Sequence, residues 1–163
     1  MNNELTHFDE QGRSRMVDVS QKQDTLRTAI ARGRIVMQPD TLQRIMDKRI
    51  EKGNVFEVAR VAAIMAAKKT ADLIPMCHPI FTTSVDVYFK ENIAESSVEI
   101  EAKATTIGKT GIEMEAVTAV SIAGLTIYDM CKAIDRSMVI DAIRLVYKAG
   151  GKSGEFRRSG EEL

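Results

Sequence analysis

The sequence contains no tryptophan, three prolines, two cysteines and two histidines. Two cysteines without CxxC spacing exclude a disulfide-rich secreted scaffold and favour a reducing compartment, so we expect a cytoplasmic protein. Neither sign of charge predominates, because 23 lysines and arginines balance 23 aspartates and glutamates. No apolar run reaches the roughly 18 residues of a membrane span. We therefore expect neither a nucleic-acid partner nor a membrane partner.

The chain of 163 residues is long enough for one hydrophobic core, and it shows no internal repeat or low-complexity tract. We expect a single domain over residues 1–163. The polar start and the glycine-rich, charged end predict mobile segments at 1–14 and 150–163.

Hydrophobic periodicity predicts strands and helices in the order β-α-α-β-β-α-β. The strands are expected at 33–38 or longer, 81–91, 97–108 and 137–148, and the helices at 39–52, 55–71 and 111–134. Residues 15–20 are typical of either an edge strand or an extended arm. The order is that of a ferredoxin-like α+β sandwich, in which helices pack on one face of an antiparallel sheet.

Two local patterns predict where helices begin. Asn54 precedes a periodic apolar run and has Glu57 three residues later, as an N-cap does. Thr110 and Glu113 have the spacing of a capping box for the helix at 111–134. Glu113 is then either a cap or a direct participant in catalysis, and the pattern leaves both readings open.

The helix expected at 111–134 is apolar and has charged side chains at its two ends. Glu115 stands near the start, and Asp129 and Lys132 stand near the end. Fourteen residues of helix place Glu115 and Asp129 about 40° apart in direction and about 21 Å apart along the axis. Both can be functional only on a long substrate or in a site built from two subunits, which points to an oligomer.

Several further residues allow a functional and a structural interpretation. Asp129 and Lys132 share a helix face, so they form either a surface ion pair or an acid–base pair. His78 lies between two prolines and is either a catalytic or a hydrogen-bonded structural histidine. Cys77 lacks a supporting base for a nucleophile, and its adjacency to His78 is not a usual zinc-ligand spacing. The run KAGGKSG is either a solvated tail or a flap of lysines and glycines that closes on phosphates.

These patterns alone indicate an α+β enzyme, oligomeric, with acids, a histidine and lysines suited to a small anionic substrate. They do not define the reaction. The reaction is indicated instead by seven characteristic segments, which follow one another along the chain: MVDVS at 16–20, KGNVF at 52–56, AAIMAAKKT at 62–70, DLIPMCHP at 72–79, GKTGIEMEAVT at 108–118, LTIYDMCKA at 125–133 and GGKSGEF at 150–156.

These segments resemble the cyclic pyranopterin monophosphate synthase family, also called the molybdenum cofactor biosynthesis protein C family. The resemblance implies a ferredoxin-like fold and a lyase that converts 3′,8-cyclo-7,8-dihydro-GTP to cyclic pyranopterin monophosphate with release of pyrophosphate. It also implies a homohexamer, a trimer of dimers, with active sites between subunits. No cofactor is required, and Mg²⁺ on the triphosphate is compatible with the motifs.

The resemblance also implies roles for individual residues. The catalytic residues would be Asp129, Lys132 and Lys52. The substrate contacts would be Met76, Cys77, His78, Glu113, Met114, Glu115, Lys148 and Arg27. The alternatives are a non-catalytic regulatory module that binds purine nucleotides and a scaffold for cofactor assembly. Turnover of the cyclised nucleotide distinguishes these three functions.

Overall fold

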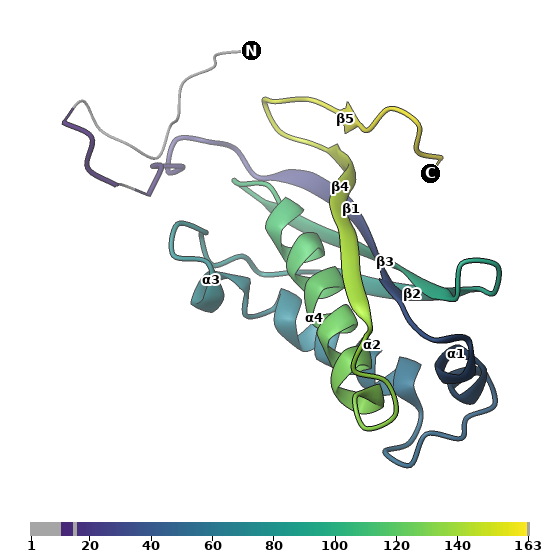
Figure 1. The fold of residues 1–163 in the computed structure, drawn as a ribbon. Coiled ribbons are helices and arrows are strands. Elements are labelled where there is room, and N and C mark those ends of the chain that lie inside the picture. Colours follow the sequence, from purple (N-terminus) through teal and green to yellow (C-terminus); the bar gives the residue numbers. More distant parts are fainter. Residues whose placement is uncertain (1–10, 15, 163) are drawn as a thin grey trace.

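The computed structural model describes residues 11–14 and 16–162 and contains one antiparallel sheet (Figure 1). The strands are β1 (Thr25–Val36), β2 (Ser84–Asn92), β3 (Ser97–Gly108), β4 (Val139–Ala149) and β5 (Phe156–Arg157). Their order across the sheet is β2-β3-β1-β4-β5. The first four strands thus have the ferredoxin-like arrangement, with the first strand at the centre.

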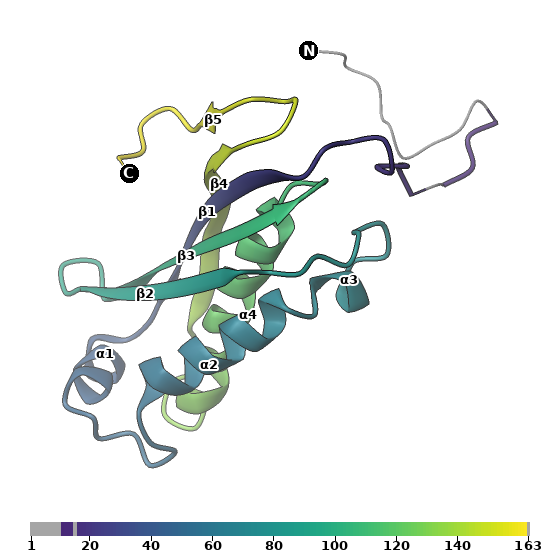
Figure 2. The ribbon, with the colours of Figure 1, turned by 180° about the vertical axis from the view of Figure 1, so that it is seen from behind.

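Four helices complete the fold: α1 (Pro39–Met46), α2 (Val55–Ala67), α3 (Thr70–Leu73) and α4 (Glu113–Cys131). The two long helices, α2 and α4, lie side by side on one face of the sheet (Figures 1 and 2). Within residues 11–14 and 16–162, no helix covers the other face. This arrangement confirms the predicted α+β sandwich with helices on one face.

Helix α4 packs closely on the sheet because small residues face it. A Cβ atom at Gly33 of β1 would lie 2.8 Å from Cγ1 of Val120, and one at Gly124 of α4 would lie 3.0 Å from Cγ2 of Ile140. Real Cβ atoms do not tolerate the first distance without a shift of their neighbours. Glycine at these positions therefore sets the distance between the helix and strands β1 and β4.

In the described part of the chain, α4 is the one helix that is long and apolar enough to cross a membrane. More than half of its apolar window is nevertheless buried inside the protein. Its buried side chains include Ala116, Ala119, Ala123 and Ile127, and they belong to the main hydrophobic cluster between helices and sheet. This is the packing of a core helix.

Several predicted boundaries are confirmed. Strand β3 covers 97–108 as expected, and it pairs with β2 in an antiparallel hairpin from Ser84 opposite Thr105 to Asn92 opposite Ser97. The side chain of Asn54 accepts a hydrogen bond from the backbone N–H of Glu57 at 3.3 Å, so the predicted N-cap of α2 is correct. Residues 16–19 form no strand, which leaves the extended arm as their conformation.

Other boundaries were wrong. Helix α1 ends at Met46, because the chain soon enters a left-handed conformation at Lys48 with φ of 55°. Helix α2 ends at Ala67 instead of residue 71, and the short α3 follows. The predicted capping box at Thr110 is also wrong: Ile112 is the N-cap of α4 and makes no side-chain cap hydrogen bond. Glu113 is therefore not explained as half of a capping box.

Mobile segments were predicted at both chain ends. The expected mobile start at 1–14 lies mostly outside the described residues. We expected no regular structure after residue 150, yet this segment contains β5, which pairs with β4 through Tyr147 opposite Arg157 and Lys148 opposite Phe156. Glu161 then forms ion pairs with Arg32 of β1 and Arg144 of β4.

Candidate active site

One cavity, with a volume of about 430 Å³, lies between the first turn of α4, the proline-flanked loop after α3 and the arm at 16–20. Strands β1 and β3 place this region at one end of the sheet, where β3 leads directly into α4 (Figure 1). Six of the predicted substrate contacts line the cavity: Met76, Cys77, His78, Glu113, Met114 and Glu115.

Glu115 is the most unusual side chain in this cavity. It is 2% exposed, and its Oε2 atom is buried without a hydrogen-bond partner among the described residues. The pKa of this carboxyl is raised to about 7, mainly by burial, with a smaller contribution from the negative charge of Glu113. A carboxyl group that titrates near neutrality can both donate and accept a proton at physiological pH.

His78 is oriented by the arm. Its Nε2 atom lies 2.7 Å from the carbonyl oxygen of Val17. A carbonyl oxygen only accepts hydrogen bonds, so Nε2 carries the proton in the neutral ring. The lone pair then resides on Nδ1, which is the atom available as a base. Pro75 and Pro79 restrict the backbone on both sides of this loop.

The arm itself is held by polar contacts that sequence reasoning did not assign. Lys109 Nζ donates to the carbonyl oxygen of Ser20 at 2.8 Å. The Asp18 carboxylate accepts the backbone N–H of Ser20 at 2.8 Å, and this bond is the main cause of the lowered pKa of Asp18. The positive charge of Lys109 lowers it further.

Six residues of the cavity wall were missed by the sequence analysis: Val17, Val19, Lys22, Ile80, Thr110 and Gly111. The sequence did indicate part of this wall, because the segments MVDVS at 16–20 and GKTG at 108–111 are among those that resemble the family. No local pattern showed that the arm at 16–20 reaches the loop around His78.

A second polar cluster lies at the opposite end of α4. Asp129 Oδ1 accepts a hydrogen bond from Lys132 Nζ at 2.6 Å. Lys52 Nζ lies 3.2 Å from Asp129 Oδ2 and donates to the Asp129 carbonyl oxygen at 2.8 Å. All three side chains are exposed. The hydrogen bond from Lys132, followed by that from Lys52, lowers the pKa of Asp129, so this carboxyl is ionised at neutral pH.

Arg27 and Lys148 form a third group, beside the turn between β4 and β5. Arg27 is buried and donates to the carbonyl oxygens of Gly108 at 2.8 Å and Lys109 at 3.0 Å. It therefore holds the loop that leads into α4. Lys148 lies opposite buried Ala29 of β1, and its Nζ atom donates to Ser153 Oγ. Neither Arg27 nor Lys148 lines the 430 Å³ cavity.

One chain does not bring the predicted site together. The Glu115 end and the Asp129 end are separated by fourteen residues of continuous helix, or about 21 Å. The structure thus places six predicted contacts in one cavity and the three predicted catalytic residues around the far end of α4. In the described part of the chain, no three His, Cys, Asp or Glu side chains are grouped to hold a metal ion.

A sequence model of the MoaC family matches residues 16–151, which include both ends of α4. The chain belongs to the MoaC family. It is 60% identical to the cyclic pyranopterin monophosphate synthase of Pelotomaculum thermopropionicum, over 97% of this chain and 93% of that protein. It is 61% identical to the proteins of the same name from Heliobacterium modesticaldum and Roseiflexus sp., in each case over 94% of this chain and 97% of the other.

The cysteines of this MoaC family member are both free. Burial raises the pKa of the Cys77 thiol, and the negative charge of Glu115 adds to this effect. Cys131, next to the Asp129 cluster, is buried, and burial raises the pKa of its thiol to about 11. Neither thiol is a thiolate at neutral pH, so neither provides an activated nucleophile.

Proposed function

We propose that this chain is a cyclic pyranopterin monophosphate synthase. It converts 3′,8-cyclo-7,8-dihydroguanosine 5′-triphosphate to cyclic pyranopterin monophosphate and pyrophosphate, an early step of molybdenum cofactor biosynthesis. The observation that carries the proposal is the nearly full-length identity of 55–61% to proteins of this name, which extends through both polar clusters of α4. The reaction class is that of a phosphorus–oxygen lyase.

The residue types fit the chemistry of this reaction. Closing the cyclic phosphate requires a hydroxyl oxygen of the substrate to attack the α-phosphorus, while the bond to the leaving pyrophosphate breaks. The ammonium groups of Lys52, Lys132 and Lys148 stabilise the charge on the phosphates. Remodelling of the guanine-derived rings moves protons at nitrogen and carbon, a role suited to Glu115 and to Nδ1 of His78.

Lys132 is assigned the role of acid or base, with Asp129 as the group that tunes it. The contact of 2.6 Å between them and the second contact from Lys52 place two ammonium groups against one ionised carboxylate. Asp129 also keeps both lysine side chains at the same end of α4. Lys132 is thereby held ready to donate a proton to the substrate.

We infer that the complete site forms between copies, in a homohexamer built as a trimer of dimers. The 21 Å separation on α4 supports this assembly, because two copies can place the Glu115 end of one beside the Asp129 end of the other. Exposed apolar side chains on the helices also support it: Val58, Val61 and Met65 of α2, and Leu125 of α4. Contacts between copies would remove this apolar surface from water.

The enzyme proposed here needs no resident cofactor. A Mg²⁺ ion would enter with the triphosphate of the substrate, bound to its oxygens. We place the protein in the cytoplasm, where free cysteines stay reduced.

The direct test is incubation of the purified protein with 3′,8-cyclo-7,8-dihydro-GTP, with Mg²⁺ and with EDTA. Pyrophosphate is measured by a coupled assay, and the cyclic pterin is measured by mass spectrometry. We expect both products in equal amounts. Tight binding of unchanged nucleotide would instead identify a regulatory module. A strict monomer at micromolar concentration, measured by light scattering, would contradict the interfacial site.

A further inference from the structure

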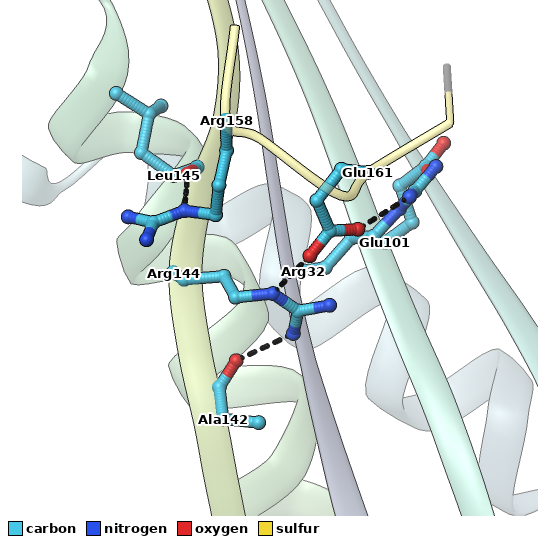
Figure 3. Close-up of polar contacts among 7 residues, drawn as sticks. All are labelled: Arg32, Glu101, Ala142, Arg144, Leu145, Arg158 and Glu161. Atoms are coloured by element: carbon cyan, nitrogen blue, oxygen red, sulfur yellow. Dashed lines mark hydrogen bonds and ion pairs between the residues drawn. The ribbon is translucent and has the colours of Figure 1, made fainter.

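The segment after β4 returns along the sheet and is fastened at several points. Residues 150–154 make a turn, and β5 then pairs with β4. Beyond β5, the backbone N–H of Arg158 donates to the Val146 carbonyl at 2.9 Å, and its Nε donates to the Leu145 carbonyl at 2.7 Å (Figure 3). The tail therefore follows β4 for several residues after the turn.

Glu161 binds the end of this tail to the sheet, on the face opposite helices α2 and α4. Its Oε2 atom lies 2.9 Å from Arg32 Nη1, and its Oε1 atom accepts a hydrogen bond from Arg144 (Figure 3). Arg32 also binds Glu101 at 2.6 Å. One carboxylate of the tail is thus joined to strands β1 and β4 and, through Arg32, to β3.

The Glu161 contacts have the features of a stabilising ion pair. Its side chain is 13% exposed, and those of Arg32 and Arg144 are 24% and 28% exposed. The hydrogen bond from Arg144 is the main cause that lowers the pKa of Glu161, so the carboxylate is ionised at neutral pH. Ion pairs of this kind, partly removed from water and shared by two arginines, are stronger than single exposed pairs.

The turn at 150–154 sits tightly on the start of β1. Gly150 and Gly151 have φ of 100° and 75°, and a Cβ atom at Gly151 would lie 2.2 Å from Nη1 of Arg27. Lys148 contacts Ser153 across the turn. The turn therefore packs against the Arg27 side chain, and its two ends are fixed by the pairing of β4 with β5.

We propose that Glu161 is a positioning residue for this turn. By holding β5 on β4, the carboxylate fixes Lys148 and Lys152 where they bind the phosphates of the substrate. The phosphate role of the turn rests on the proposed function, whereas the ordering role of Glu161 does not. Glu161 acts through the turn and touches no substrate.

The test compares Glu161→Gln with Glu162→Gln, which removes the same charge from the adjacent exposed residue. Hydrogen exchange at the amides of Gly154 and Arg158 reports the order of the turn and of β5. We expect roughly tenfold faster exchange in E161Q, the change that accompanies a loss of about 1.4 kcal/mol, and wild-type exchange in E162Q. Arg144→Met removes the partner instead and is expected to act in the same direction.

Binding of inorganic triphosphate by calorimetry and steady-state kinetics complete the test. We expect E161Q to weaken triphosphate binding and raise KM by about fivefold to tenfold with kcat within about twofold, because a loosened turn must be ordered on binding. Circular dichroism verifies that each variant is folded.

Unchanged exchange in folded E161Q would overturn the proposal, and so would faster exchange with unchanged triphosphate affinity. If the wild-type protein does not bind triphosphate, the phosphate role of the turn is wrong. If it binds triphosphate but forms no pterin, the proposed function fails while the positioning of the turn stands.

Discussion

The two ends of α4 carry the same kind of side chain in opposite environments. Glu115, at the start of the helix, is buried, and its pKa is raised to about 7. Asp129, near the end, is exposed between Lys132 and Lys52, and its pKa is lowered. The proton affinity of each carboxyl is therefore set by what surrounds it, with desolvation dominant at one end and cations at the other.

This difference divides the chemistry between the ends. The Glu115 carboxyl can exchange protons near neutral pH, and the Asp129 carboxylate holds two ammonium groups beside it. Neither end alone holds both the buried carboxyl and the paired ammonium groups. A site that uses Glu115 together with Lys132 and Lys52 requires one end from each of two copies, and the following experiments test this division.

The largest effect is expected for Lys132→Met. The change removes the proposed acid or base and one cation, so we expect kcat to fall by about 10²–10⁴-fold, the usual contribution of a general acid or base. Steady-state turnover of 3′,8-cyclo-7,8-dihydro-GTP measures the loss. Lys103→Met, at an exposed lysine of β3, is the matched control and should keep wild-type turnover. Near-normal turnover in K132M would remove Lys132 from the mechanism.

A stability effect is expected at the other end for Glu115→Gln. The pKa of Glu115 is about 7 in the folded protein, above the ordinary value of 4.5. Below pH 4.5 the carboxyl is protonated in both the folded and the unfolded chain, so it does not lower the free energy of unfolding there. As pH rises from 4.5 to 7, the unfolded chain ionises first, and the free energy of unfolding falls by about 3 kcal/mol in total. Above pH 7 the penalty is complete.

E115Q lacks this ionisation, so its free energy of unfolding should not show the decline between pH 4.5 and 7. Urea denaturation at a fixed protein concentration measures the difference from wild type at each pH. Glu91→Gln, at an exposed carboxyl of β2, should follow the wild-type curve. Parallel curves for E115Q and wild type would show that folding does not raise the pKa of Glu115.

A smaller effect, the partial recovery of activity in mixed oligomers, tests whether one site uses the Glu115 end of one copy and the Lys132 end of another. Glu115→Ala and Lys132→Met damage opposite ends, so a mixed oligomer contains some sites with both ends intact. Random mixing of equal amounts should restore about a quarter of the wild-type sites in a symmetric oligomer. Activity is measured after co-expression and again after mixing of separately folded variants. If co-expression restores no activity, each copy must contain its own complete site.

Local patterns predicted the parts of the fold that depend on neighbouring residues. Strand β3 alternates along its length and has the predicted bounds, and Asn54 caps α2 through Glu57. The patterns failed where a contact from a distant part of the chain competed. Thr110 has capping-box spacing, but the helix begins after Ile112, since Arg27 holds the preceding loop through the Gly108 and Lys109 carbonyls.

Contacts between residues far apart in the chain could not be predicted. Arg32 and Glu161 are 129 positions apart, and their ion pair organises a tail whose composition is typical of disorder. The contact between His78 and the Val17 carbonyl spans 61 positions. The candidate site residues came from the motifs, whereas their division between two ends of α4 already followed from helix geometry. The cavity at one end required the structure.

The raised pKa values of the two thiols have a consequence for the chemical durability of the protein. Peroxides and electrophiles react with thiolates, and sulfenic acid and mixed disulfides form where a thiolate is exposed. Cys131 is fully buried with a pKa of about 11, and the pKa of Cys77 is also raised. The Cys131 thiol should therefore be protected from peroxides by burial and by its raised pKa, and the partly exposed Cys77 thiol should react more slowly than a low-pKa cysteine.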